Sequence, residues 1–196
     1  QVKHKKNRHL EGQDIASIAR QKECDALDFM FDLALEENLD TVFTATLMNS
    51  DEQAVGEMIK NDHSVISLSD AGAHLTFFCD AGYGLHLMGH WSRDLKVLSL
   101  SEAVKKLTAD PANLFGIKGR GQIKVGNWAD LMLFDPAEVG RGGLERVNDL
   151  PAEGSRLTTA ALGVHGVWIN GQRVVCPSGF LPNSPLAGMV LREFDA

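Results

Sequence analysis

Strand-like and helical segments alternate between residues 41 and 115, and this order constrains the fold more than any other feature. The β-branched and aromatic residues of 41–47 predict a strand. The short apolar run 64–68 is typical of a strand buried in a parallel sheet. Helices are predicted after these strands, over 50–60 and 99–107. Strand, helix, strand, helix is the order expected of a parallel α/β sheet.

Helix signals also mark the start of the chain. The segments 14–21 and 25–36 carry apolar residues at helical spacing, so each is expected to pack one face against a core. Residue pairs typical of helix N-termini predict three further helix starts: Ser50 with Gln53, Ser99 with Glu102, and Asp110 with Pro111. The last of these helices is expected to end before Gly116.

The pattern changes after Gly116, where glycines separate short apolar runs. Asn170-Gly171 is a strong hairpin signal, because both central residues of a type I′ turn need positive φ. The glycine-rich stretch 140–143 lacks the ending of a phosphate-binding loop and is interpreted as an ordinary loop. Four strands of a small β domain are therefore predicted: 122–125, 129–134, 164–169 and 172–175.

Composition excludes several classes of partner. With 196 residues, 44% of them hydrophobic, the chain can bury a sizeable core, and its net charge of −7 disfavours nucleic acid and anionic membranes. The basic cluster 3–8 is expected to be an exposed segment. No apolar run approaches the roughly 20 residues of a membrane helix. No signal-peptide core is recognised either, so a cytoplasmic protein is expected. Three cysteines without a CxxC pair support neither a disulfide framework nor a structural zinc site.

Asp70 stands where the predicted strand 64–68 ends, and His74 follows four residues later. The carboxyl ends of parallel strands form the working face of α/β proteins, so an ionisable residue there is a candidate catalytic group. Gly72 allows the sharp turn that carries His74 back toward the same place. The alternative is that Asp70 is only a turn former or a helix N-cap.

Three segments resemble the C-terminal portion of the amidohydrolase superfamily: 67–74 (SLSDAGAH), 107–136 and 164–175. The Ser-Asp pair with a histidine four residues after the aspartate is most similar to the D-aminoacylase (N-acyl-D-amino-acid deacylase) branch. The resemblance implies an α/β fold, the C-terminal part of a metal-dependent (β/α)8 TIM barrel plus part of a small β-sandwich. Residues 1–118 then belong to the barrel and 119–196 to the sandwich, with 41–47 and 65–68 as the seventh and eighth barrel strands.

The resemblance also assigns roles. Asp70 matches the aspartate that contacts the metal-bound water, so it is expected to be the general base and a metal contact. His74, His86, His90 and Arg93 are expected to bind the substrate, a small N-acyl amino acid, and zinc is the expected cofactor. For the last three of these residues the alternative is an ordinary loop or helix start.

The chain departs from the superfamily pattern in its metal ligands. It contains no His-x-His pair. A complete barrel alone takes roughly 250 residues, so 196 residues are too few for a barrel together with a sandwich. A C-terminal fragment, inactive alone, is therefore expected. Two alternatives stay open: a non-catalytic module that self-associates as a homo-oligomer or binds a missing N-terminal segment, and a cyclic amidase of the dihydroorotase or hydantoinase kind.

Overall fold

The computed structural model describes residues 1–45, 48–69, 71–72, 74–184, 186–192 and 194. The chain forms two compact units, residues 1–50 and 51–196. The boundary after residue 118, expected from the family, stays a prediction. In the described part of the chain, no helix combines the length and the apolar character that crossing a membrane requires.

The first unit is helical. Side chains of Asp14 and Asp25 accept hydrogen bonds from backbone N–H groups of the two α-helices that follow them, which fixes where these helices begin. The helices predicted over 14–21 and 25–36 are thus confirmed. The unit contains η1 (Lys5–Leu10), α1 (Ile15–Gln21) and α2 (Ala26–Glu36). Its core consists of Ile18, Ala19, Phe29 and Leu33.

Glu37 is buried at the end of α2, with only 1% of its surface exposed. Its carboxylate accepts a hydrogen bond from Asn7 Nδ2 at 2.6 Å and others from the backbone N–H groups of Lys3 and His4. Burial raises the pKa of Glu37, but these hydrogen bonds outweigh it and the pKa lies below its ordinary value. The ionised carboxylate therefore ties the N-terminal residues to α2.

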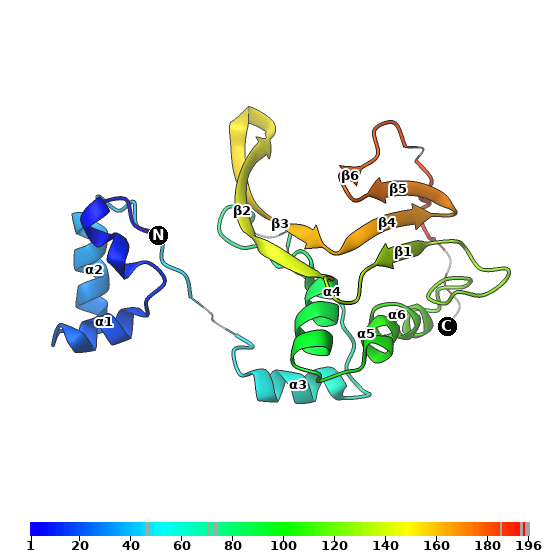
Figure 1. Ribbon diagram of the computed structural model, residues 1–196, viewed down its shortest axis with the longest axis horizontal. Helices are drawn as coiled ribbons and strands as arrows, with labels where there is room; N and C mark the ends of the chain where they lie inside the picture. The colour runs from blue at the N-terminus through cyan, green and yellow to red at the C-terminus, as the bar shows by residue number, and fades with distance from the viewer. Residues whose placement is uncertain (46–47, 70, 73, 185, 193, 195–196) are drawn as a thin grey trace. The chain divides into compact units, whose positions relative to one another are not determined.

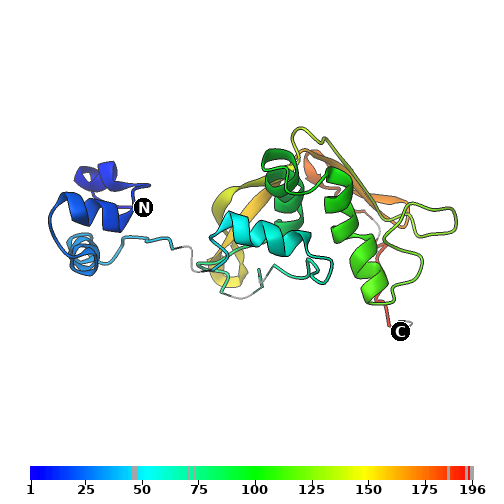
Figure 2. The same ribbon diagram turned by 90° about the horizontal axis from the view of Figure 1, so that it is seen from below.

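The second unit places its helices on one side and a small sheet on the other (Figure 1). Figure 2 shows the same helices in front of the strands. The helices are α3 (Glu52–Lys60), α4 (Tyr83–His86), the π-helix η2 (Leu87–Asp94), α5 (Leu100–Leu107) and α6 (Ala109–Leu114). Their common core contains Ile59, Leu87, Met88, Trp91, Leu98, Ala103 and Val139. The capping box of Ser99 and Glu102 begins α5, as predicted.

Two antiparallel sheets form the β part of this unit. One contains four strands in the order β1-β4-β5-β6, and the other is the long β2-β3 ribbon. Asn170 and Gly171 have φ values of 48° and 76° between β4 and β5, which confirms the predicted hairpin. The strands are β1 (Leu131–Phe134), β2 (Gly140–Leu150), β3 (Gly154–Leu162), β4 (Val164–Ile169), β5 (Gln172–Cys176) and β6 (Gly179–Phe180); a short turn, η3 (Pro151–Glu153), joins β2 to β3.

The strands predicted before residue 126 do not form. Residues 41–45, 64–69 and 122–125 belong to no strand, and every strand pair in the described residues is antiparallel. Residues 46–47 lie outside the described part of the chain. In the first segment a single reciprocal pair of hydrogen bonds joins Val42 to Gln1. A β-branched run becomes a strand only where a neighbour pairs with it over several residues.

Three local predictions were wrong. The supposed loop at 140–143 begins strand β2, because β3 pairs with it. The N-cap of α3 is Asp51 rather than Ser50, since the Asp51 carboxylate accepts from the N–H groups of Gln53 and Ala54. Asp110 lies inside α6, whose preceding residue is Thr108.

Candidate functional site

His86 and His90 lie on adjacent turns of one continuous helix, formed by α4 and η2. Their rings stack, with centroids 4.8 Å apart and planes 11° apart. The π-helical turn is closed by the Leu95 N–H, which donates to the His90 carbonyl five residues earlier at 2.9 Å. Such widened turns are frequent at functional sites because they shift the side chains of a helix.

A carboxylate from another helix contacts this histidine pair. His90 Nε2 lies 2.7 Å from Glu52 Oε1, at the start of α3. The edge of the Trp91 ring packs against His90 at a centroid distance of 5.4 Å. Glu52 therefore orients the His90 imidazole through the ring nitrogen Nε2.

The environment of His86 favours the neutral imidazole. Burial lowers the pKa of His86, and the nearby His90 and Arg141 side chains lower it further. The carboxylates of Asp80 and Glu52 act in the opposite direction and do not reverse the shift. This shift favours the neutral imidazole of His86, which can accept a proton or donate a hydrogen bond.

Arg93 ends the same helix and joins it to the β part of the unit. Its guanidinium donates to Asp94 Oδ1 at 2.8 Å and to the Val139 carbonyl at 2.6 Å. The contact with Asp94 raises the pKa of Arg93 and holds the pKa of Asp94 below its ordinary value. In this arrangement Arg93 positions η2 against the start of β2, and its role toward substrate stays a prediction.

The segment that contains Asp70 and His74 is only partly described. Asp70 itself lies outside the described residues. His74 has a positive φ of 52°, and its ring stacks on Phe77 with centroids 5.0 Å apart. The structure thus brings His86, His90 and Arg93 together on one helix, whereas His74 lies on the loop before that helix.

Sequence reasoning missed the acidic and basic partners of this helix. Besides Glu52, these are Asp80 and Arg141, whose side chains form an ion pair at 3.2 Å. Arg141 reaches Asp80 because β2 passes over Gly82, where a Cβ would lie 3.1 Å from the Arg141 side chain. The one local signal was the Gly-Arg-Gly-Gly stretch, in which Gly142 packs closely on Ala160 of β3, where a Cβ would lie 3.2 Å from the Ala160 carbonyl oxygen.

The described side chains on this helix do not form a metal centre. A catalytic zinc usually needs about three protein ligands that converge on one point. Within the described part of the chain such a group occurs at one place, Asp135 with Glu138 and His165, and it includes neither His86 nor His90. The ligand set that the family implies is therefore not assembled by these residues.

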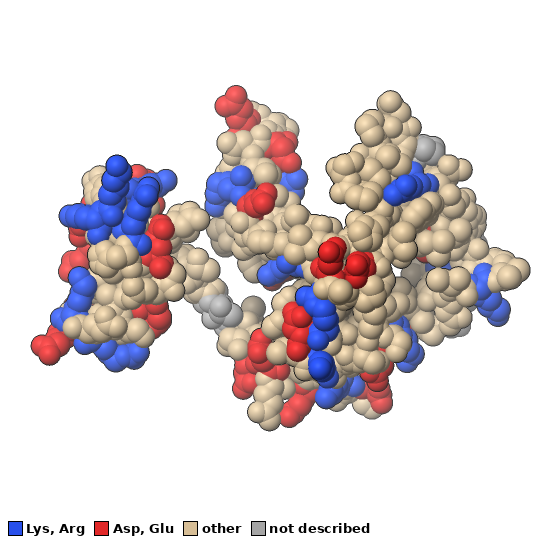
Figure 3. Space-filling model, in the orientation of Figure 1, with Lys and Arg blue, Asp and Glu red and all other residues tan. Residues whose placement is uncertain are grey.

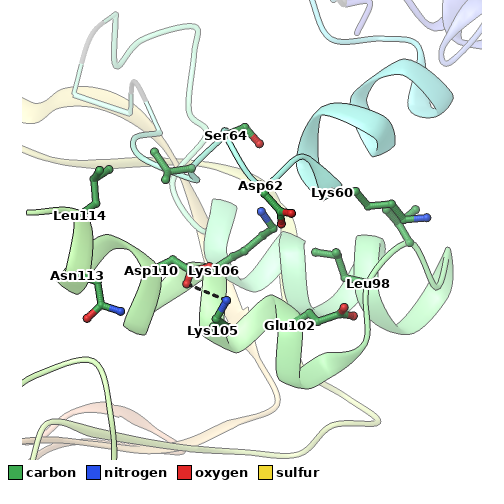
Figure 4. Close-up of a pocket in the computed structure, with 12 residues that line it drawn as sticks. Lys60, Asp62, Ser64, Leu98, Glu102, Lys105, Lys106, Asp110, Asn113 and Leu114 are labelled. Carbon is green, nitrogen blue, oxygen red and sulfur yellow. Dashed lines mark ion pairs between the residues drawn. The ribbon is translucent and has the colours of Figure 1, made fainter.

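A pocket of about 860 Å³ lies on the helical face of the second unit (Figure 4). Three lysines and three carboxylates line it together with apolar residues, and Lys105 pairs with Asp110 at 3.2 Å. None of the predicted site residues is among its lining residues. Its balanced charges favour neither an anionic nor a cationic ligand.

Comparison with known proteins decides the family. The model of the Amidohydrolase family matches residues 6–175. The chain belongs to the amidohydrolase family. This confirms the family resemblance of SLSDAGAH and the two later segments, and D-aminoacylases are among the relatives.

Several relatives of this amidohydrolase chain are D-aminoacylases or deacylases of N-acyl-D-amino acids. It is 30% identical to the N-acyl-D-glutamate deacylase of Alcaligenes xylosoxydans xylosoxydans over 187 residues, which are 93% of this chain and 34% of that protein. The structure of N-acyl-D-glutamate deacylase from Bordetella bronchiseptica, with zinc and a phosphonate inhibitor that mimics the tetrahedral intermediate, matches with a TM-score of 0.55 and 26% identity. That match covers 95% of this chain and 36% of the solved one.

A D-aminoacylase variant in complex with copper chloride matches with a TM-score of 0.54 and 27% identity, over 94% of this chain and 35% of that one. The amidohydrolase chain therefore spans about a third of the length of each of these three relatives. Both solved relatives are described with a metal, which supports metal dependence as a property of the neighbours.

Proposed function

We propose that this chain is the C-terminal portion of an amidohydrolase that cleaves the amide bond of N-acyl-D-amino acids. The observation that carries the proposal is the match of 93% of the chain to an N-acyl-D-glutamate deacylase. The substrate is a small N-acyl amino acid, and the products are a carboxylate and a D-amino acid. A cytoplasmic location and a homo-oligomeric state stay predictions.

The fold proposal follows from the same relationship. Residues 1–118 are the last part of a (β/α)8 barrel, and 119–196 are part of a β-sandwich. The antiparallel sheet β1-β4-β5-β6 supports the second assignment. The extended segments 41–45 and 64–69 become barrel strands seven and eight where the other barrel strands pair with them, because strand structure requires such neighbours.

We assign the proton transfer to Asp70. Its carboxylate takes a proton from the water that attacks the amide carbon, and returns it to the leaving amine. His74, His86, His90 and Arg93 face the substrate, and the neutral state of His86 suits a hydrogen bond to it. Zinc, the cofactor expected for the complete protein, would contact Asp70, and its other ligands would lie outside the described histidine pair, where three ligand atoms do not converge.

The test is the variant Asp70→Asn in the complete protein, with the release of D-amino acid from N-acetyl-D-glutamate and other N-acyl-D-amino acids as the readout. We expect kcat to fall roughly 100-fold or more, the usual effect of removing a general base. Asp62→Asn, which changes an exposed carboxylate nearby in sequence, is the matched control and retains activity. Unchanged turnover in Asp70→Asn contradicts the assignment.

The 196-residue chain alone is expected to show no turnover, because most of the metal ligands are missing from it. Activity of the purified, zinc-loaded chain would show this expectation to be wrong. Light scattering separates the alternative of a non-catalytic module, which forms one defined oligomer, from a fragment with unpaired strands, which aggregates.

A further inference from the structure

We propose that Asp135, Glu138 and His165 bind a divalent transition-metal ion of the zinc class, at a site separate from the proposed catalytic residues. Each residue offers one ligand atom, and these atoms all lie within 4.8 Å of one another. Two come from the turn between β1 and β2, and the third comes from β4. Figure 3 shows acidic side chains gathered over this turn.

The turn that carries Asp135 and Glu138 is held by several backbone hydrogen bonds. The Asp135 carbonyl accepts hydrogen bonds from the N–H groups of Glu138 at 3.2 Å and Val139 at 2.8 Å. The Asp135 N–H donates to the Gly163 carbonyl at 2.8 Å, which joins the turn to the segment just before β4. Asp135 and Glu138 therefore share one turn whose position relative to β4 is fixed by the backbone.

Gly163 lets the backbone of this turn pack directly against the backbone just before β4. A Cβ at Gly163 would lie 2.5 Å from the Val139 nitrogen and 2.6 Å from the Glu138 carbonyl carbon. Any other residue would push the Glu138–Val139 peptide away. The glycine thus brings Glu138 within reach of His165, two residues along the strand.

His165 occupies an irregular position in β4. Phe134 pairs with Val164, whereas Leu133 pairs with Gly166, so His165 is the extra residue of a bulge. A bulge commonly re-aims a side chain that a regular strand would direct elsewhere. The nearby Arg173 guanidinium donates to the His165 and Val175 carbonyls, so its cation is engaged with the backbone.

The ligand chemistry selects the class of ion. Zinc accepts histidine nitrogen and carboxylate oxygen at about 2.0–2.2 Å, which places any two of its ligands no more than about 4 Å apart. The exposed Glu138 side chain closes the remaining distance by rotation. The imidazole favours zinc over calcium and magnesium, which take oxygen ligands. Two carboxylates also balance the charge of a divalent ion.

A bound ion would join the β1–β2 turn to β4 in addition to the Asp135–Gly163 hydrogen bond and the close packing at Gly163. The same turn leads to Val139, whose carbonyl accepts from Arg93 of η2 at 2.6 Å. The ion would therefore fix the backbone group on which the histidine-bearing helix rests. Its role is structural, and no step of amide hydrolysis depends on it.

The experiment is calorimetric titration of the full 196-residue chain, stripped of metal, with zinc chloride. We compare the wild type with His165→Asn and Glu138→Gln, two surface changes of similar size. The matched control is His63→Asn, which removes an exposed histidine from the turn after α3. We expect the wild type and the control to bind one zinc ion more tightly than either site variant, by tenfold or more in Kd.

A second readout identifies the ligand directly. Zinc should shift the imidazole ¹⁵N resonances of His165, whereas excess magnesium or calcium chloride should not. It should also raise the melting temperature of the wild type but not of Glu138→Gln. The proposal is overturned if His165→Asn binds zinc with wild-type stoichiometry and affinity, or if the wild type binds no zinc. Zinc that shifts only His86 and His90 overturns it as well.

Discussion

Gly163 is the residue at which a single added carbon has the clearest structural consequence. Its φ is +62°, and a Cβ there would clash with the backbone of Glu138 and Val139. We expect Gly163→Ala to lower the free energy of unfolding of the second unit by about 2 kcal/mol or more, because strain and clash add. Urea unfolding followed by tryptophan fluorescence measures this, since all three tryptophans lie in residues 51–196.

Gly143→Ala is the matched control, because Gly143 has an ordinary φ and no atom within 4 Å of the added carbon. Its midpoint should remain within experimental error of the wild type. Equal midpoints for Gly163→Ala and Gly143→Ala would show that the turn between β1 and β2 adapts freely. In that event the close approach of Glu138 to β4 is not a fixed feature of the fold.

Single residues also show where sequence reasoning ends. Asp70 and His74 are recognisable because a short motif carries them. Glu52 and Arg141 carry no such motif: each gains its significance from a partner 38 or 61 positions away, His90 and Asp80 respectively. A contact of this length depends on how helices and strands pack, which one-dimensional spacing does not encode.

Helix α5 is the element whose start the sequence predicts most fully. The Ser99 hydroxyl accepts from the Glu102 N–H, and the Glu102 carboxylate accepts from the Ser99 N–H at 2.8 Å. We expect Ser99→Ala to cost about 1 kcal/mol of the free energy of unfolding, the usual effect of losing an N-cap. Urea unfolding with circular dichroism provides the measurement.

Ser101→Ala is the comparison for this cap, because the Ser101 side chain lies in the first turn and touches the Ser99 hydroxyl at 3.1 Å without itself accepting from a backbone N–H among the described hydrogen bonds. Alanine has the higher helix propensity, so this variant should be neutral or slightly stabilising. A loss as large as that of Ser99→Ala would argue against the capping box as the source of stability.

Locally bonded elements were predicted in outline, although the starts of α3 and α6 were misplaced by one or two residues, whereas strands β2 and β3, which need a partner farther along the chain, were not predicted. The Ser99 capping box and the Asn170-Gly171 hairpin depend on residues within four positions of each other. The segment 64–68 has the composition of a strand, but no strand pair within the described residues includes it. Conversely, residues 140–143 have the composition of a loop, and pairing with β3 makes them a strand. Pairing energy, rather than propensity, decides these cases.

At the scale of the whole molecule, the chain combines two units with separate cores. The first is held by one helical pair and by the buried Glu37, and the second by helices packed on antiparallel strands. The family relationship extends across both, since the matched residues 6–175 include nearly all of the first unit. The first unit is therefore part of the amidohydrolase chain. Its stability depends on the buried carboxylate of Glu37 and the hydrogen bonds that this carboxylate accepts.

The buried Glu37 carboxylate makes the stability of the first unit depend on pH. The pKa of Glu37 is lower in the folded state than its ordinary value near 4.5, so the unfolded chain binds the proton more strongly. The stability that Glu37 contributes is thus complete above about pH 4.5 and is lost as the pH falls through the folded pKa. We expect amide NMR signals of residues 1–45 to lose dispersion as the pH falls below about 4.5 and through the lowered folded pKa of Glu37.

Glu37→Gln tests the cause of that pH dependence. The amide has no charge to lose, and its NH2 group faces the donors of Asn7, Lys3 and His4, so the first unit should be less stable at pH 7 and less sensitive to acid. Glu23→Gln, at an exposed position of the same unit, should behave as the wild type. If Glu37→Gln keeps the wild-type pH profile, another group governs the acid transition, and the buried carboxylate does not hold the N-terminal residues on α2.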